Sequence, residues 1–185
     1  MILGERVRLR AIERDDLPRF VRWLNDPEVR QGLELFLPMS QTEEERWYER
    51  VLNLPPEEHP FAIDALLGEE WVHIGSCGLG RTNRRSHSAE LGIAIGDKAF
   101  WDQGYGTDTM RLLLEHAFDG LNLHRVHLRV FESNKRAIKV YRRVGFKEEG
   151  RLREDHFAKG RYWDTLVMGL LGADWRAQRE GKADG

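Results

Sequence analysis

The stretch AELGIAIGDKAFWDQGYGTDTMRLLLEHAF, residues 89–118, joins an apolar run to an amphipathic run through a loop that holds two glycines. The apolar run at Ala89–Ile95 predicts a strand, and Thr107–Phe118, which carries Leu112, Leu113, Leu114 and Phe118, predicts an amphipathic helix. The run HRVHLRVF, residues 124–131, predicts the following strand. A strand, a helix and a strand in this order indicate one βαβ unit whose two strands are parallel.

The segments on either side of this unit predict an otherwise antiparallel sheet. The expected strands are 6–12, Phe61–Leu66, Val72–Leu79 and two runs around a turn at Lys159–Gly160, and the expected helices are Asp15–Asn25, Ser40–Leu52, where SQTE is a capping box, and Asn134–Gly145. This order indicates an α+β fold with a mixed, mostly antiparallel sheet and a central βαβ unit.

Composition excludes several classes of protein. Of the 185 residues 41% are apolar and 32% charged, which is typical of one globular domain, and the net charge of −2 gives no basic field for nucleic acid. Cys77 is the only cysteine, so no disulfide framework or cysteine zinc site is predicted. The longest apolar stretch, residues 166–173, is too short to cross a membrane, and no signal peptide is recognisable. We expect a soluble cytoplasmic protein without a metal or a membrane partner.

The glycine loop has two interpretations. A helix start exposes unpaired N–H groups and a partial positive charge, and Gly104 and Gly106 leave room for a phosphate beside them. Thr107 can donate a further bond. The loop can equally be a tight turn without a ligand. Thr109 stands where a dinucleotide fingerprint needs its third glycine, and the lysine of an ATP-binding loop is missing. Neither NAD nor ATP is therefore favoured.

A second candidate site follows in ESNKRAIKVYRRVGF, residues 132–146. Asn134 stands at the start of the predicted helix and Tyr141 two turns later, among the basic residues Lys135, Arg136, Lys139, Arg142 and Arg143. Taken alone, the charges indicate a solvated face and the tyrosine a core position. Next to a helix start that suits a phosphate, they predict a binding site for a second phosphorylated part of one ligand.

These motifs resemble the CoA-dependent N-acetyltransferases of the GNAT superfamily. The resemblance rests on AELGIAI, QGYGT and SNxxAxxxYxxxGF, and it extends to LRAIERDDLPRFVRWLNDPEV and GRLREDHFAKGRYWDTLVMGLL. It covers about residues 5–175 and is greatest for the RimJ/RimL-like branch, which acetylates the N-termini of ribosomal proteins. It implies a GNAT-like fold with splayed strands, a single N-acetyltransferase domain at residues 1–175 and a flexible tail at 176–185.

The resemblance also implies a binding mode for acetyl-CoA, the co-substrate, without a metal. Backbone groups of the loop would wrap the CoA diphosphate, and the splayed strand would pair with the pantetheine arm. Asn134 would bond the same arm, and Tyr141 would protonate the departing thiolate. Trp101 stands where many relatives carry Gln or Arg. The implied cofactor-binding residues are Ile93, Ala94, Ile95, Gln103, Gly104, Tyr105, Gly106, Thr107, Asn134, Lys139 and Arg143.

Several residues are candidates for the base that would deprotonate the amine. Some relatives carry a glutamate twelve residues before the tyrosine, but that position is Arg129 here, which cannot accept a proton. Glu90 is the candidate base, acting through water, and its alternative role is a structural carboxylate that holds the acceptor loop. His127 and Glu132 are weaker candidates.

The acceptor amine is expected to be a protein or peptide N-terminus, as in the branch resembled. The alternatives are a small amine (a polyamine, an aminoglycoside or an amino acid) and a non-catalytic module that binds acyl-CoA. The loops at 26–42 and 80–88 are expected to select the acceptor, and Trp47 and LELFLP are candidates to line its cleft. A homodimer would be consistent with the sequence.

Overall fold

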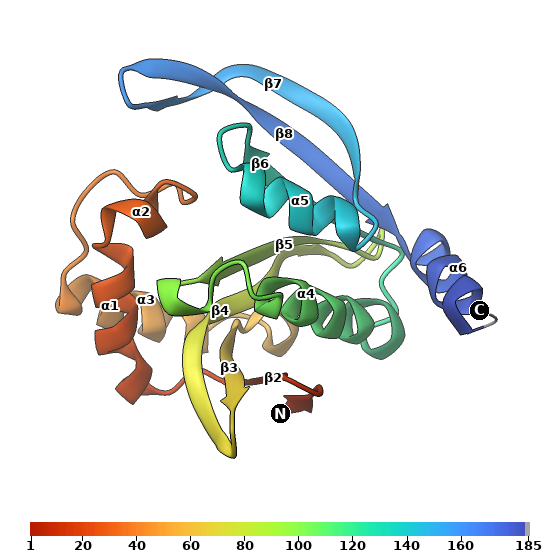
Figure 1. Ribbon diagram of the computed structural model, residues 1–185, viewed down its shortest axis with the longest axis horizontal. Coiled ribbons are helices and arrows are strands. Elements are labelled where there is room, and N and C mark those ends of the chain that lie inside the picture. The colour runs from red at the N-terminus through yellow and green to blue at the C-terminus, as the bar shows by residue number, and fades with distance from the viewer. Residues whose placement is uncertain (184–185) are drawn as a thin grey trace.

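The computed structural model describes residues 1–183, which form one eight-stranded sheet with helices on both faces (Figure 1). The strand order is β1-β2-β3-β4-β5-β6-β8-β7. The strands are β1 (Ile2–Leu3), β2 (Val7–Ala11), β3 (Phe61–Leu67), β4 (Glu70–Asn83), β5 (Ser88–Ile95), β6 (Arg125–Phe131), β7 (Lys147–Ala158) and β8 (Arg161–Leu171). The expected α+β fold with a mostly antiparallel sheet is confirmed. β4 is longer at both ends than predicted, and the two-residue β1 was not predicted.

The parallel pair β5–β6 positions the site. Among the strands within residues 1–183 it is the only parallel pair, and it runs only from Ser88–Glu90 opposite Arg125–His127. Beyond Glu90, β5 stays paired with β4 as far as Ile95, whereas β6 pairs with β8 as far as Phe131. The two strands therefore splay, as expected, and the sheet divides into two halves that are joined at one end only (Figure 1).

Local signals explain where the main helices begin and end. The helices are α1 (Leu17–Leu24), α2 (Pro27–Arg30), α3 (Gln41–Leu52), α4 (Tyr105–Glu115), α5 (Lys135–Arg143) and α6 (Gly172–Ala183), and one π-helical turn (His116–Gly120) extends α4. Ser40 and Glu43 form the predicted capping box of α3. Gly145 follows α5 with a φ of 104°, a conformation that suits glycine at a helix end. The four-residue α2 was not predicted.

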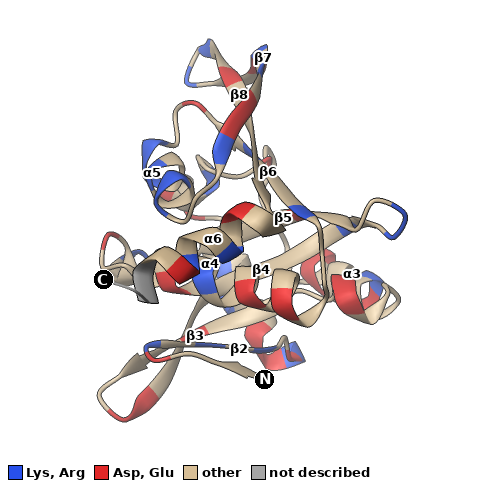
Figure 2. Ribbon diagram, turned by 90° about the vertical axis from the view of Figure 1, so that its right-hand side faces the viewer, with Lys and Arg blue, Asp and Glu red and all other residues tan. Residues whose placement is uncertain are grey.

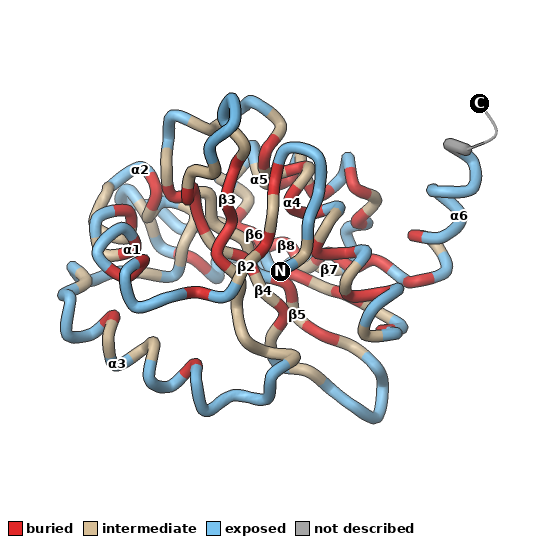
Figure 3. Tube along the Cα trace, turned by 90° about the horizontal axis from the view of Figure 1, so that it is seen from below, coloured by how far each residue is buried: buried red, intermediate tan, exposed pale blue. Residues whose placement is uncertain are grey.

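Two apolar clusters lie on opposite faces of the sheet. Ile63 faces the larger cluster, which includes Leu113 and Leu114 of α4, whereas its neighbour Ala62 faces the smaller one beneath α1. Successive side chains of a strand point to opposite faces, so α4 and α1 cover different sides. Figure 3 shows the buried residues gathered along the strands and the exposed ones along the outer helices.

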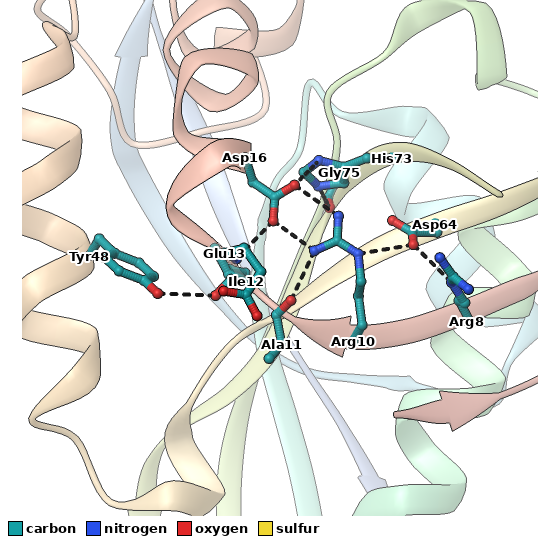
Figure 4. A network of polar contacts seen from close by, with 10 residues as sticks. All are labelled: Arg8, Arg10, Ala11, Ile12, Glu13, Asp16, Tyr48, Asp64, His73 and Gly75. Atoms are coloured by element: carbon teal, nitrogen blue, oxygen red, sulfur yellow. Dashed lines mark hydrogen bonds and ion pairs between the residues drawn. The ribbon is translucent and has the colours of Figure 1, made fainter.

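A buried polar network fixes the segment before α1 to the sheet (Figure 4). Arg10 of β2 donates to Asp16 at 2.7 and 2.8 Å and to Asp64 of β3 at 3.0 Å. Arg8 donates to the same Asp64 carboxylate at 2.9 Å, and the His73 ring lies 3.1 Å from Asp16. Burial alone would raise the pKa of Asp16, but bonds from Arg10 and His73 outweigh it and hold that pKa well below its usual range.

The C-terminal segment differs from expectation. A flexible tail was expected from residue 176, but α6 continues to Ala183. The reason is an apolar anchor at its start: the buried Trp175 ring packs 6.1 Å from the Phe118 ring, and Arg179 donates to Asp119 at 2.6 Å. Residues 184–185 of the expected tail lie outside the described residues. No helix in the described part of the chain is long and apolar enough to cross a membrane.

Candidate active site

The splay between β5 and β6 opens into a cleft of about 660 Å³. Its walls are the end of β5 and the loop before α4 on one side and α5 on the other, and α2 and the β7–β8 turn also reach it. Ten of the predicted site residues line it: Ile93, Ala94, Ile95, Gly104, Gly106, Thr107, Asn134, Lys139, Tyr141 and Arg143. The structure therefore brings together residues from three separate motifs. Gln103, Tyr105 and Glu90 are not among its lining residues.

The glycine loop has the shape that close approach of a ligand requires. Gly104 caps α4 with a φ of 92°, in the left-handed region that favours glycine. A Cβ added to Gly106 would meet no atom within 4 Å, so this position opens onto free space. Thr107 and Asp108 donate their N–H groups to the Gly104 carbonyl at 2.9 and 3.1 Å. The N–H groups of Tyr105 and Gly106, at the first two helical positions, are those that a helix start leaves for an anion.

The side chains of two loop residues are engaged within the chain and do not line the cleft. Tyr105 is buried, with its ring 5.4 Å from the Phe100 ring. The Gln103 amide donates to the Ala99 carbonyl. Their side chains therefore shape the loop, and any contact they make with a ligand must come from the backbone.

Trp101 joins the two walls of the cleft. Its ring nitrogen donates to the Ile95 carbonyl at 2.7 Å, at the end of the splayed strand. The guanidinium carbon of Arg136, in the first turn of α5, lies 3.7 Å from the centre of the Trp101 ring. This cation–π contact crosses from the β5 side to the α5 side, a role that the sequence did not predict for either residue.

Helix α5 is rich in basic residues (Figure 2), and two of its cations line the cleft. Lys139 and Arg143 are four residues apart and both line it, and no carboxylate of the described chain lies within 4 Å of either. Asn134 caps the helix by accepting the Ala137 N–H at 3.2 Å. Its amide nitrogen lies 2.7 Å from where a Cβ on Gly32 would stand, so the end of α2 closes against this corner.

Tyr141 supplies a protonated hydroxyl to the cleft. The residue is buried, and its ring lies 6.0 Å from the Phe146 ring. Burial raises the pKa of the phenol to about 12, because the phenolate would lose its solvation. The hydroxyl is therefore fully protonated at neutral pH and can act as a proton donor.

Glu90 lies at the junction where β5 and β6 still pair, outside the cleft lining. Its carboxylate accepts from Arg81 at 2.8 Å, so it holds the loop at 80–88. The other candidate bases are also engaged or buried. Glu132 lies 3.3 Å from Arg151, and the His127 Nδ1 is buried without a hydrogen-bond partner in the described chain. Arg129 pairs with Asp155 at 2.9 Å.

The expected acceptor segments divide in the structure. Of the 26–42 loop, Glu28, Val29, Gln31, Gly32 and Leu33 line the cleft. The 80–88 loop borders a separate hollow with Leu121 and Leu123. Trp47 packs its ring 6.0 Å from the Phe20 ring and does not line the cleft, and Phe36 and Leu37 are exposed. Trp47 and the 80–88 loop therefore do not line this cleft, and their part in selecting the acceptor stays a prediction.

The sequence missed the contribution of the β7–β8 turn. Lys159 at this turn donates to the Gln31 side chain at 2.9 Å, 128 residues away, and Ala158 and Trp163 line the cleft beside it. Figure 1 shows the β7–β8 hairpin extending from the sheet above α2. The turn residues Lys159 and Gly160 were recognised, but nothing in the sequence indicates which distant element they meet.

The chain is similar to known acetyltransferases over most of its length. Residues 6–147 match the family model described as acetyltransferase (GNAT) domain. The chain is 31% identical over 170 residues to a spermidine N(1)-acetyltransferase from Vibrio cholerae, covering 91% of this chain and 95% of that one. It is 26% identical over 181 residues to the putative ribosomal N-acetyltransferase YdaF from Bacillus subtilis, covering 96% and 97%.

Among solved structures, the spermidine N-acetyltransferase from Vibrio cholerae in complex with CoA and spermine superposes with a TM-score of 0.84 at 28% identity. The superposition covers 94% of this chain and 99% of that one. The fold and nearly the whole length of the chain are therefore shared with an enzyme whose structure holds CoA.

Proposed function

This chain belongs to the GNAT acetyltransferase family and is an acetyl-CoA-dependent N-acetyltransferase, and we propose that its acceptor is the primary amine of a small molecule such as a polyamine. The observation that carries the acceptor proposal is the superposition with the spermidine N-acetyltransferase over 99% of that chain's length. A second candidate is a ribosomal-protein N-terminus, which the similarity to YdaF favours.

The described residues fit acetyl-CoA. Gly106 leaves open space beside a helix start, where a diphosphate can approach the backbone. Lys139 and Arg143 line the same cleft without acidic partners, and they would meet the phosphates of the nucleotide end. The backbone at Ile93–Ile95, which β6 leaves unpaired, would hold the pantetheine arm. When bound, acetyl-CoA supplies the activated acetyl group as a thioester.

Two of the chain's own groups would serve the transfer. Tyr141 carries its phenolic proton at neutral pH and would give it to the sulfur atom that leaves, and the phenolate would regain a proton from the nitrogen that has attacked the acetyl carbon. We assign Glu90 to holding the 80–88 loop through Arg81 rather than to deprotonating the amine, because it does not reach the cleft. The amine would then have to be neutral before it attacks. An amine with a pKa near 10.4 is neutral in well under about a thousandth of its molecules at pH 7, so the rate should rise with pH.

The test is a panel of acceptors assayed by release of the CoA thiol. It offers spermidine, L-amino acids, a peptide with only its N-terminus free and a peptide with only a lysine amine free. We expect the highest kcat/KM with a small amine. A higher kcat/KM with the free peptide N-terminus would favour the second candidate, and no thiol release with any amine would contradict both.

The Tyr141→Phe variant is the catalytic control for this panel. It removes one oxygen and keeps the ring, and loss of a general acid should lower kcat by a factor of about 10² to 10⁴ with CoA binding little altered. An unchanged kcat in the folded variant would reduce Tyr141 to a packing role. The Glu90→Gln variant should keep kcat within about threefold, since a group that only holds a loop does not enter the transition state. A loss as large as that of Tyr141→Phe would return Glu90 to the role of base.

A further inference from the structure

Arg6, the residue before β2, reaches across the molecule to the loop that opens α4. Its Nε donates to the Asp108 carboxylate at 2.9 Å, and its Nη2 donates to the same oxygen. Its Nη1 donates to the Gln103 carbonyl at 3.3 Å. The guanidinium carbon lies 4.9 Å from the centre of the Tyr105 ring. One side chain thus contacts three residues of a loop that is about a hundred positions away in the sequence.

The same side chain fixes how closely the loop backbone approaches. A Cβ added to Gly104 would stand 2.8 Å from the Arg6 Nη2, so the guanidinium packs directly against this glycine. Gly104 has a φ of 92° and directly precedes the N–H groups at the start of α4. The position of Arg6 therefore bears on the direction in which those N–H groups point.

The contact between Arg6 and Asp108 has an electrostatic effect as well as a structural one. Asp108 lies in the first turn of α4, beside the N–H groups that would meet a diphosphate. A carboxylate favours the positive end of a helix dipole, but it repels a second anion bound at that end. Arg6 is its nearest cation, and the Arg111 guanidinium lies farther away, at 3.9 Å. The positive charge of the Arg6 guanidinium therefore neutralises the Asp108 carboxylate, which would otherwise repel a diphosphate bound at the start of α4.

We propose that Arg6 is a positioning residue for acetyl-CoA: it holds the 103–108 loop in its binding shape and neutralises Asp108, without touching the ligand. This inference rests on the proposed role of the loop in binding the CoA diphosphate, and it is independent of which amine is the acceptor. It assigns a cofactor-binding role to a residue that lies outside the cleft lining.

The experiment is a double-mutant cycle read by calorimetry with CoA, at two salt concentrations. The variants are Arg6→Met, which keeps the aliphatic stem, Asp108→Asn, and the two combined. Arg6→Met should weaken CoA binding roughly three- to tenfold, since an exposed charge near a helix end has an effect of this size. The kcat at saturating acetyl-CoA should stay within about twofold of wild type. The combined variant should recover at least half of the lost affinity on a logarithmic scale, and the loss should shrink at high salt.

Arg111→Met is the matched control, because it removes a cation beside the same carboxylate without contacting the loop backbone. It should change the affinity less than Arg6→Met does. Wild-type affinity in Arg6→Met would overturn the inference, as would a combined variant that binds no better than Arg6→Met alone. If Arg6→Met does not fold, Arg6→Lys replaces it, because lysine keeps the charge with fewer hydrogen-bond donors, and it should lose less CoA affinity than Arg6→Met would. Wild-type CoA affinity in Arg6→Lys, together with no increase of affinity in Asp108→Asn, would also overturn the inference. Failure of the wild-type protein to bind CoA would instead contradict the proposed function.

Discussion

Two clusters of charged side chains, the network at Asp16 and Asp64 and the basic residues of α5, differ in whether their cations are paired with carboxylates. In the network beneath α1, Arg8 and Arg10 face Asp64 and Asp16, which are 3% and 8% exposed, so each buried carboxylate is held by cations. On α5, Lys139 and Arg143 line the cleft, and no carboxylate of the described chain lies within 4 Å of either. The carboxylates of the first cluster are paired within the folded chain, whereas under the proposed function the cations of the second are paired by the phosphates of CoA.

This difference predicts that the first cluster contributes to folding stability and the second to ligand binding. A buried carboxylate must be paired or hydrogen-bonded, because its desolvation otherwise costs several kcal/mol. A cation at the surface of a cleft stays hydrated without a partner, so leaving it unpaired costs the fold little. The network should therefore respond to mutation in its unfolding equilibrium, and the α5 pair should respond in its affinity for CoA.

The largest effect is expected for Asp64→Asn. The change removes the carboxylate that Arg8 and Arg10 share and leaves two guanidinium groups against a neutral amide. Breaking a buried pair by removing one partner costs about 3–5 kcal/mol, so the free energy of unfolding in urea should fall by about 3 kcal/mol or more. The control is Glu49→Gln, because the Arg14–Glu49 pair is 58% exposed on each side and its loss should leave the midpoint nearly unchanged. If Asp64→Asn and Glu49→Gln lowered the free energy of unfolding equally, the buried network would contribute no more to stability than an exposed ion pair.

A second effect is expected in the pH dependence of stability. The folded-state pKa of Asp16 lies below its unfolded value, chiefly because bonds from Arg10 and His73 outweigh burial. Its contribution to stability is therefore complete above the unfolded pKa of about 3.9 and is lost as the pH falls below it. One proton changes the free energy of unfolding by at most about 1.4 kcal/mol per pH unit.

Urea unfolding at pH 5, 4 and 3 would measure this slope in the wild type and in Asp16→Asn. The variant should be less stable at pH 5 and should lose less stability on acidification, because it has no carboxyl to protonate at that position. If the free energy of unfolding of the two proteins fell equally with pH, Asp16 would not titrate between pH 5 and 3. The network would then make no measurable contribution to the pH dependence of stability through Asp16.

The sequence predicted the parts of the site that local chemistry determines. Gly104 and Gly106 before a helix, and Asn134 at the start of the next one, are turn and cap signals that act within a few residues. The splay at Glu90 came from the resemblance alone, since no pattern of a single strand says where its neighbour leaves it. The helix α6 was not predicted, because one aromatic residue, Trp175, in a polar segment gives no periodicity, although its ring packs α6 against the core.

The contacts that the sequence could not predict are long-range side-chain contacts. No local pattern predicted that Arg81 would donate to Glu90, and Lys159 gave no sign of reaching Gln31. Each of these depends on which loop folds back onto which strand. A side chain's residue type limits its chemistry, but its partner decides whether that chemistry is free for a substrate or already used within the fold.

The smallest effect, and the one that sharpens the comparison most, is expected for Lys139→Ala combined with Arg143→Ala. Both side chains line the cleft one helical turn apart, so their removal should weaken CoA binding by about tenfold, as loss of one or two partly exposed phosphate contacts would. The free energy of unfolding should change by less than about 0.5 kcal/mol, because neither residue is paired within the fold. Calorimetry with CoA and urea unfolding of the same preparations give the two readouts.

Arg142→Ala is the matched control on the same helix. Its side chain pairs with Glu148 at 3.4 Å and does not line the cleft, so its loss should leave CoA affinity within about twofold while removing one positive charge from the same helix. A loss of affinity equal to that of the double variant would mean that α5 attracts CoA through its overall field rather than through the two cleft residues. Calorimetry with dephospho-CoA, which lacks the 3′-phosphate, resolves the contact further: if the pair meets that phosphate, wild type and double variant should bind dephospho-CoA equally. A tenfold difference that persists with dephospho-CoA would place both cations at the diphosphate instead, alongside the N–H groups of Tyr105 and Gly106.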